Sequence, residues 1–217
     1  MRLGILGGTF NPIHLAHLRV AEEVREVCTL DQVLFLPAAT PPHKSVAEAT
    51  PFAERMAMVE LAIADHPDFA VSDLEGRRRG KNFSVDTLEI LQRERPGDEL
   101  FFIIGMDSFR DLATWHDYRR IFTLANIVVA PRPGVAETPP GERLPVAMRD
   151  QFCYDDQSKI WRHAGGTTLI FLEETYLDIS STRIRQLVAA GRSIRYLVPP
   201  AVAEYIRRRG LYRPSER

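Results

Sequence analysis

Short apolar segments alternate with longer amphipathic ones along this chain of 217 residues, and this alternation limits its fold more than any other feature. Strands are expected at 2–6, 32–36, 69–72, 100–104, 126–130 and 168–172. Helices are expected at 14–27, 52–65, 84–94, 181–190 and 199–210, with a short helix after the strand at 100–104. Strands that alternate with helices favour crossover connections and a parallel sheet covered on both faces. The pattern therefore predicts a Rossmann-like, doubly wound α/β fold with a mostly parallel sheet and a small helical part at its C-terminal end.

Local expectations follow from single residues. In the first expected helix, the apolar stripe consists of Ala16, Val20, Val24 and Val27, and the glutamates fall mostly off it. Ser84 is the expected N-cap of the helix at 84–94. Residues 131–166 are interrupted by many prolines and glycines, so they are predicted to form a long irregular connection.

The composition excludes several classes of protein. Apolar residues make up 45% and charged residues 26% of the chain, the ordinary balance of a globular protein. With 28 Lys and Arg against 29 Asp and Glu, no overall charge attracts nucleic acid or a membrane. No targeting segment or membrane helix is visible, so a cytoplasmic location is expected. Cys28 and Cys153 are expected as small core residues, and residues 1–217 as one domain with a helical subregion at 182–217.

The loop after the first strand combines features of a phosphate-binding site. Gly7 and Gly8 let the backbone turn tightly and approach a ligand closely. Pro12 stands just before the next helix, whose N-terminus presents free N–H groups and the positive end of its dipole. His14 and His17 are three residues apart, so they share one face of the first helical turn.

Other interpretations of this loop fit less well. A dinucleotide fingerprint needs Gly-x-Gly-x-x-Gly and an acidic residue at the end of the second strand, whereas this strand ends in Leu36-Pro37. A zinc site needs three or four ligands, and no cluster of Cys or His nearby completes a set with His14 and His17. Taken alone, a Gly-Gly pair is also compatible with a simple tight turn.

A second anion site is expected where the helix at 181–190 begins. Ser180 or Ser181 caps this helix, and Thr182 and Arg185 share a face three residues apart. A hydroxyl, free N–H groups and a guanidinium at one helix end suit a polyphosphate. Taken alone, such a segment is more often a capped surface helix with an exposed arginine.

Candidate residues also follow the other expected strands. Two prolines stiffen the backbone before His43 and Lys44. Asp107, near the carboxyl end of a strand, can accept hydrogen bonds from ribose hydroxyls, and Trp115 can stack on an aromatic base. The alternatives are an ordinary exposed turn for Lys44, a helix N-cap for Asp107 and a core position for Trp115.

Together these segments resemble a known family. The run GGTFNPIHLAH resembles the signature of the nucleotidylyltransferase superfamily, and the run ISSTRIR resembles its second signature, ISSTxxR. Ala16 stands where the superfamily usually has Gly. Within the superfamily, the chain resembles bacterial nicotinate-nucleotide adenylyltransferases, which form deamido-NAD and pyrophosphate from ATP and nicotinate mononucleotide. The resemblance covers nearly the whole chain and is weakest at residues 131–166.

The resemblance implies roles for particular residues. Catalysis falls to His14, His17 and Arg185, with His17 as the main donor to the oxygens of the α-phosphorus. The implied ATP-binding residues are Gly7, Gly8, Thr9, Phe10, His14, His17, Gly105, Asp107, Ile179, Ser180, Ser181, Thr182 and Arg185. The implied residues for nicotinate mononucleotide are Gly8, Lys44, Ser84, Thr87, Trp115 and His116. In the family, main-chain N–H groups near the position of Ser84 hold the nicotinate carboxylate, and the tryptophan packs on the pyridine ring.

The reaction implied by this resemblance needs little covalent chemistry from the protein. A mononucleotide phosphate is already a nucleophile at pH 7, so catalysis is expected from positioning and charge stabilisation. Mg²⁺ is the expected cofactor, held by the phosphates of ATP and by water, and no metal site on the protein is expected. The alternatives are an adenylyltransferase for nicotinamide mononucleotide or pantetheine phosphate, and a nucleotide-binding regulator without turnover. The expected partners are ATP and nicotinate mononucleotide, and neither nucleic acid nor a membrane is expected. The sequence is compatible with a homo-oligomer.

Overall fold

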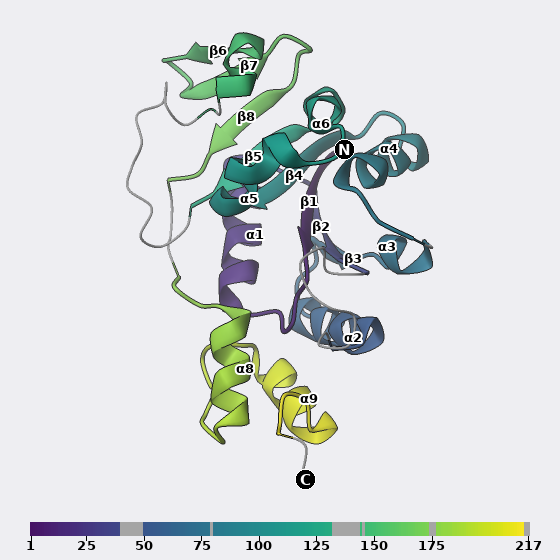
Figure 1. Cartoon of the computed structure of the whole chain (residues 1–217), viewed down its shortest axis with the longest axis vertical. Helices are drawn as coiled ribbons and strands as arrows, with labels where there is room; N and C mark the ends of the chain where they lie inside the picture. Colours follow the sequence, from purple (N-terminus) through teal and green to yellow (C-terminus); the bar gives the residue numbers. More distant parts are fainter. Residues whose placement is uncertain (40–49, 79, 132–143, 145, 174–176, 215–217) are drawn as a thin grey trace.

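The computed structural model describes residues 1–39, 50–78, 80–131, 144, 146–173 and 177–214. Within these residues, eight strands form one sheet in the order β3-β2-β1-β4-β5-β8-β7-β6 (Figure 1). The strands are β1 (Arg2–Gly8), β2 (Gln32–Pro37), β3 (Phe69–Val71), β4 (Glu99–Gly105), β5 (Asn126–Ala130), β6 (Phe152–Asp155), β7 (Ile160–His163) and β8 (Thr168–Phe171). Neighbouring strands from β3 to β8 pair in parallel, and the hairpin of β7 and β6 continues the sheet antiparallel. The predicted Rossmann-like, mostly parallel sheet is confirmed.

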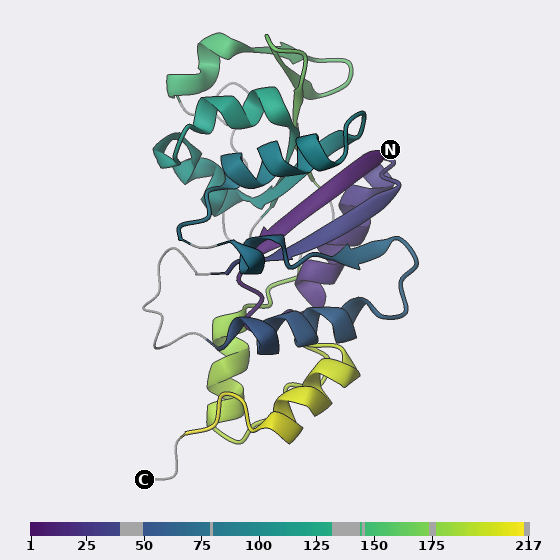
Figure 2. The ribbon, with the colours of Figure 1, turned by 90° about the vertical axis from the view of Figure 1, so that its right-hand side faces the viewer.

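Helices cover both faces of this sheet (Figure 2). They are α1 (Leu15–Val27), α2 (Phe52–Ile63), α3 (Leu74–Arg77), α4 (Ser84–Glu94), α5 (Met106–Asp111), α6 (Tyr118–Leu124), α8 (Ser181–Ala189) and α9 (Pro200–Arg209), with the 3₁₀ helices η2 (Leu112–Thr114) and η3 (Val146–Gln151). Side chains of α1, α2, α8 and α9 belong to one apolar cluster, and those of α4, α5 and α6 belong to another. No helix in the described ranges is long and apolar enough to cross a membrane.

The central strands contribute to both apolar clusters because successive side chains of a strand point to opposite faces. In β2, Val33 and Phe35 pack in the cluster of α1 and α2, whereas Leu34 and Leu36 pack in the cluster of α4. All four side chains are at most 5% exposed. Burial on both faces explains why these strands are continuous apolar runs rather than alternating ones.

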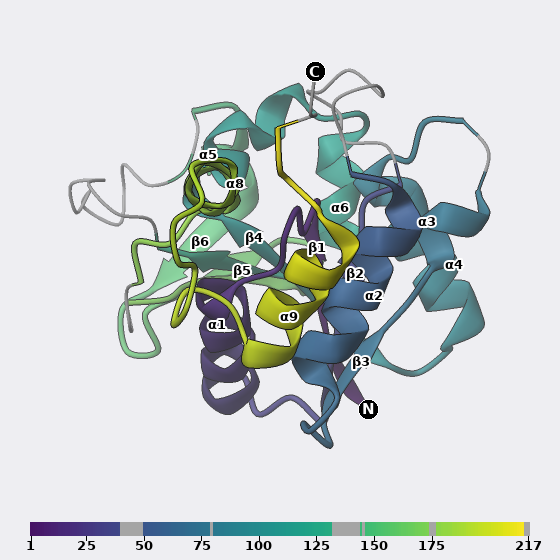
Figure 3. The same ribbon diagram turned by 90° about the horizontal axis from the view of Figure 1, so that it is seen from below.

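The C-terminal helices α8 and α9 lie beyond the end of the sheet at which β1 and β2 finish (Figure 1). Seen from below, α9 runs alongside α2 (Figure 3). Glu54 of α2 accepts a hydrogen bond from the Tyr205 hydroxyl at 2.9 Å and forms an ion pair with Arg209. The predicted C-terminal helical part is therefore packed against the helix that follows β2.

The segment 131–166 differs from the expected irregular connection, because its later part forms η3 and the hairpin of β6 and β7. The turn of this hairpin is closed by Asp155, whose carboxylate accepts hydrogen bonds from the N–H groups of Gln157 and Ser158 at 3.1 and 3.3 Å. These bonds and the contact with Arg162 lower the pKa of Asp155 to about 2. Strands of four residues are too short to show a periodic pattern of apolar residues. The hairpin could have been predicted only from turn-forming residues such as Asp155.

Three expectations about burial were wrong. Val27 is 53% exposed because it lies in the last turn of α1, where the helix ends and Cys28 turns inward instead. Glu23 is 2% exposed, and its carboxylate accepts a hydrogen bond from Arg19 at 2.9 Å. Cys153 is exposed on β6, whereas Cys28 is buried, and burial raises the pKa of the Cys28 thiol to about 11.

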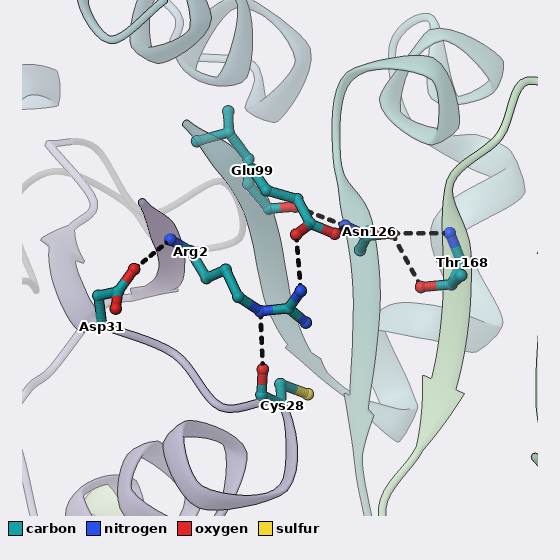
Figure 4. A network of polar contacts seen from close by, with 7 residues as sticks. Arg2, Cys28, Asp31, Glu99, Asn126 and Thr168 are labelled. Carbon is teal, nitrogen blue, oxygen red and sulfur yellow. Dashed lines mark hydrogen bonds and ion pairs between the residues drawn. The ribbon is translucent and has the colours of Figure 1, made fainter. Parts of the chain in front are cut away.

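A polar network joins strands at the end of the sheet where β1 begins (Figure 4). The Asn126 amide of β5 donates to Glu99 of β4 at 2.9 Å. Its oxygen accepts from the N–H and the hydroxyl of Thr168 in β8, both at 2.8 Å. Glu99 also forms an ion pair with Arg2 of β1 at 2.8 Å. The network therefore connects strands of the sheet that are far apart in the sequence.

We expect Asn126→Ala to destabilise the fold by about 1–3 kcal/mol, because it removes the buried amide that connects half-buried Thr168 of β8 with Glu99 of β4. Urea unfolding measures the change as a lower midpoint at an unchanged slope. Thr168→Val, which removes only one hydroxyl from the network, is the control and should cost less. Equal midpoints for Asn126→Ala and the wild type would contradict the role of this network.

Candidate active site

The beginnings of α1 and α8 meet, although they are about 170 residues apart in the chain. The Ser181 hydroxyl donates to the carbonyl oxygen of Pro12 at 2.9 Å. The Arg185 guanidinium donates to the carbonyl oxygen of Asn11 at 2.8 Å. Figure 1 shows the loop after β1 reaching the start of α8. The two segments predicted to bind phosphate are therefore in contact.

His14 and His17 form a stacked pair at the start of α1. Their ring centroids are 3.7 Å apart with an angle of 24° between the planes, and His14 is the N-cap residue. The main-chain N–H of His14 donates to Nδ1 of His17 at 3.2 Å. Because Nδ1 accepts this bond, the neutral imidazole of His17 carries its proton on Nε2. His17 thus has an N–H donor on the side of the ring that faces away from its own helix turn.

The tight turn expected at Gly7 and Gly8 lies at Phe10 instead. Gly7 and Gly8 are the last residues of β1, whereas Phe10 has a left-handed backbone with φ of 47°. A Cβ at position 8 would lie 3.0 Å from the Phe10 ring, so a larger residue there would require this ring to shift. The same ring contacts His17 edge-on, with centroids 5.1 Å apart. The Phe10 ring therefore packs against both the end of β1 and the histidine pair. A left-handed backbone at a residue other than glycine is strained, and such strain is typical of functional loops.

Ser180, rather than Ser181, caps α8. The Ser180 hydroxyl accepts a hydrogen bond from the N–H of Arg183 at 3.2 Å. Arg185 donates to the Thr182 hydroxyl at 3.2 Å, which confirms that these residues share a face. The first N–H groups of a helix have no partner within the helix and can bind an anion. Ile179 is half-buried just before the cap, where it packs against the cluster of α1 and α2.

The site lies where the order of the sheet reverses. From β1 the chain proceeds outward to β2 and β3, and the following strand β4 pairs with β1 on its other side. Ligands of such sheets bind at the carboxyl ends of the strands next to this switch point. Gly105 ends β4 and is the N-cap of α5, and Asp107 is exposed in the first turn of that helix. The alternative of Asp107 as the N-cap is therefore wrong.

The segments expected to hold the pyridine nucleotide are brought together. The rings of Phe83 and His116 lie 4.4 Å apart, next to Ser84 and Trp115. Trp115 is half-buried, and its ring meets Phe102 edge-on at 6.4 Å. Ser84 is the first residue of α4 and its expected role as the N-cap was wrong, because the N-cap is Phe83. This position leaves the N–H group of Ser84 among those without a helical partner.

Of the other residues expected to bind the mononucleotide, the structure describes Thr87 but not Lys44. Thr87 is 4% exposed, and its hydroxyl lies 3.4 Å from Glu75 and 3.5 Å from Arg78. Its hydroxyl is thus engaged by neighbouring side chains of α3 and the chain that follows it. Lys44 lies outside the described residues, between Ala39 and Thr50.

Sequence reasoning missed the buried polar groups around the loop. Arg55 of α2 is 1% exposed and donates to the carbonyl oxygen of Thr9 at 2.8 Å. The Tyr212 hydroxyl donates to the Asn11 side chain at 2.7 Å, and burial raises the pKa of Tyr212 to about 12. Burial also lowers the pKa of Arg55 and raises that of Glu75. The available signal was the place of Arg55 on the apolar stripe of its helix, at helical spacing from buried Val59.

Comparison with known proteins was decisive for the family. The family model of cytidylyltransferase-like proteins matches residues 5–187, a range that contains both helix starts. The chain belongs to the cytidylyltransferase-like family. A relative from Syntrophotalea carbinolica, called "Probable nicotinate-nucleotide adenylyltransferase", is 64% identical over 217 residues and covers 100% of both chains. A protein of the same description from Geobacter sulfurreducens is 55% identical over 212 residues, 98% of each chain. The resemblance to nicotinate-nucleotide adenylyltransferases that was stated from the sequence is thereby confirmed.

Solved structures of low sequence identity share the fold of this cytidylyltransferase-like chain. A Plasmodium falciparum nicotinic acid mononucleotide adenylyltransferase complexed with APC has a TM-score of 0.72 at 18% identity and covers 97% of this chain and 96% of that one. The same enzyme complexed with NaAD has a TM-score of 0.73 at 19% identity, covering 97% of each chain. At this identity the likeness extends to the fold alone.

The arrangement in this family member is suited to binding a phosphate chain. The N-termini of α1 and α8 lie at the loop after β1. The ring of His17 and the Arg185 guanidinium lie at the same loop. In the described part of the chain, no group of three or more His, Cys, Asp and Glu side chains could hold a metal ion.

We expect Ser181→Ala to weaken the binding of inorganic tripolyphosphate about tenfold, because the Pro12 carbonyl loses its partner and the start of α8 is held to the loop after β1 less firmly. At a fixed ligand concentration this equals about 1.4 kcal/mol less ligand-dependent stabilisation. Thermal unfolding with and without tripolyphosphate measures the difference. Ser193→Ala, on an exposed turn between α8 and α9, is the matched control. Full stabilisation of the Ser181→Ala protein by tripolyphosphate would contradict the assignment.

Proposed function

We propose that this chain transfers the adenylyl group of ATP to nicotinate mononucleotide and releases pyrophosphate, forming deamido-NAD. The observation that carries the proposal is the contact of the His14–His17 helix start with the Ser181–Arg185 helix start beside the switch point of the sheet. The description shared by relatives that are more than half identical supports the same reaction. The function is therefore a step of pyridine nucleotide biosynthesis.

The reaction requires alignment more than covalent assistance. The 5′-phosphate of the mononucleotide attacks the α-phosphorus of ATP in line, a new P–O bond forms, and the bond to the β-phosphate oxygen breaks. The attacking phosphate is ionised at neutral pH, so no base has to remove a proton. Holding both phosphates in a reactive geometry can supply roughly 7–11 kcal/mol of the barrier reduction.

Charge stabilisation falls to the groups that converge at the helix starts. The Nε2–H of His17 supplies a donor for the oxygens of the α-phosphorus, and the stacked His14 fixes the ring plane. The N–H groups of the first turn of α8 and the Arg185 guanidinium receive the remaining phosphates, whereas the first N–H of α1, that of Leu15, already donates to the carbonyl of Leu197 at 3.0 Å. Gly8 ends β1, and Thr9 and Phe10 follow it in the loop that leads to the histidine pair. Mg²⁺ would be carried by the phosphates of ATP, where it neutralises charge on the leaving pyrophosphate.

The acceptor would lie toward β4 and α4. Between the two substrates, Asp107, in the first turn of α5 just after β4, would accept hydrogen bonds from the ribose hydroxyls of ATP. The N-terminus of α4 at Ser84 offers N–H groups to the nicotinate carboxylate, next to Trp115 and His116. Lys44 is assigned to the phosphate of the mononucleotide from the resemblance alone.

We expect His17→Ala to lower kcat by roughly 10²–10³-fold, the loss typical of removing one donor to a developing oxyanion. Initial rates of pyrophosphate release measure kcat at saturating ATP and nicotinate mononucleotide. His66→Ala is the matched control, because His66 is also stacked on an aromatic ring but lies beside β3. A folded His17→Ala enzyme within threefold of the wild-type kcat would exclude this role.

The substrate is tested by offering candidate acceptors side by side. Pyrophosphate release is measured with ATP, Mg²⁺ and either nicotinate mononucleotide, nicotinamide mononucleotide or pantetheine phosphate. We expect the fastest release with nicotinate mononucleotide, because the α4 N-terminus favours a carboxylate over a neutral amide. Preference for the amide would contradict the carboxylate assignment. Binding of ATP without release in any arm would favour the nucleotide-binding regulator.

A further inference from the structure

Arg55 lies fully buried beside the loop after β1 and beside Ala39 and Thr50. In the described part of the chain, its guanidinium donates to the carbonyl oxygens of Thr9 at 2.8 Å, Ala39 at 3.2 Å and Thr50 at 3.1 Å. Thr9 follows β1, Ala39 follows β2, and Thr50 precedes α2. One side chain thus connects separate stretches of main chain at the carboxyl ends of neighbouring strands.

The surroundings of Arg55 are unusual for a buried charge. At 1% exposure, it has no carboxylate within ion-pair distance among the described residues. Its hydrogen-bond acceptors are neutral carbonyl groups, and its guanidinium lies over the Phe52 ring, 5.5 Å from the ring centre. Burying a guanidinium without an opposite charge is costly, and a methionine or leucine would fill the same space at lower cost. What the arginine adds is a planar fork of donors that reaches several carbonyls at fixed directions, which a lysine cannot reproduce. Its benefit is therefore geometric.

The carbonyl of Thr9 determines how the nucleotide loop faces the site. In a trans peptide unit, the C=O and the following N–H point in opposite directions. Because Arg55 holds the Thr9 carbonyl inward, the N–H of Phe10 points away from the guanidinium. Phe10 then turns the chain with its left-handed backbone toward the start of α1 and the histidine pair. The orientation of this peptide unit therefore depends on Arg55.

A second nitrogen of the Arg55 guanidinium donates to Ala39, whose main chain is hydrogen-bonded at both its N–H and its C=O. The N–H of Ala39 donates to the Glu75 carboxylate of α3 at 3.3 Å, while its carbonyl accepts from Arg55. The preceding Ala38 N–H donates to the carbonyl of Gly8 at 2.8 Å. The exit from β2 is thereby aligned with the loop after β1, and Glu75 also contacts Thr87 of α4. Arg55 and Glu75 link the ATP side and the acceptor side of the site.

We propose that Arg55 is a positioning residue for adenylyl transfer, which orients the Thr9–Phe10 peptide and the Ala39 main chain so that ATP is bound in its reactive geometry. The inference rests on the proposed function, because it concerns the same loop. Arg55 does not touch the reacting atoms; it acts through the main chain that does. The alternative is that Arg55 contributes to folding only.

The test compares Arg55→Lys, which keeps the charge but loses the fork, with Arg55→Met, which keeps the volume and loses both. Arg209→Lys is the matched control. Arg209 is an exposed residue of α9, and its ion-pair partner Glu54 lies next to Arg55 in α2, so the control makes the same substitution at a contact with the same helix. For each full-length protein, KM for ATP and kcat are measured well below the unfolding midpoint, together with the Kd of a non-hydrolysable ATP analogue. We expect Arg55→Lys to raise KM and Kd about tenfold or more, the effect of losing one charged hydrogen bond.

The split between KM and kcat distinguishes positioning from folding. A partly unfolded enzyme has a lower kcat in proportion to its folded fraction, whereas the KM of the folded molecules is unchanged. An unchanged KM and Kd for Arg55→Lys, with or without a lower unfolding midpoint, would overturn the proposal, and so would a variant that has no folded population. Wild-type affinity in Arg55→Lys with weak binding in Arg55→Met would also overturn it, since charge alone would then suffice. If the wild type forms no deamido-NAD but the analogue binding still depends on Arg55, the proposed function fails and the positioning role stands.

Discussion

The hydrogen bonds from α8 to the loop after β1 are the constraint on which the site depends. Ser181 and Arg185 donate to the carbonyls of Pro12 and Asn11, across separations of 169 and 174 residues in the chain. Each helix start alone is a common anion-binding feature of limited affinity. These hydrogen bonds hold the start of α8 against the loop that leads into α1. In the proposed function, a triphosphate is bound by groups of both segments, so its affinity depends on their contact.

Sheet topology explains why this contact falls beside β1. The chain order reverses between β1 and β4, so the connections from these strands leave on opposite sides and leave room at their carboxyl ends. The loop after β1 occupies this place from one side and the start of α5 from the other. Buried polar groups then orient the loop: Arg55 from α2 and Tyr212 from the chain after α9. A nucleotide would meet a loop whose main chain is held before binding, which lowers the ordering cost of binding.

The success of sequence reasoning differed between parts of the chain for physical reasons. Central strands such as β4 are buried on both faces and appear as continuous apolar runs, so their places were predicted correctly. The hairpin of β6 and β7 was missed because its strands are four residues long and half-exposed. Arg55 gave only a weak signal, a charge on an apolar helix face, because its partners Thr9 and Ala39 are distant in the chain. Ser180 and Ser181 were equivalent as caps until the helix start was placed.

By itself the sequence determined the α/β class, the glycine and proline punctuation around the first loop, the spacing of His14 and His17, and the second signature at 179–185. These are local properties, since periodicity and capping depend on residues a few positions apart. Only the tertiary structure decided that the signatures meet and that Arg55 binds the carbonyls of Thr9 and Ala39. Hydrogen-bond partners far apart in the chain leave no periodic trace in it, so they become visible only when the chain is folded.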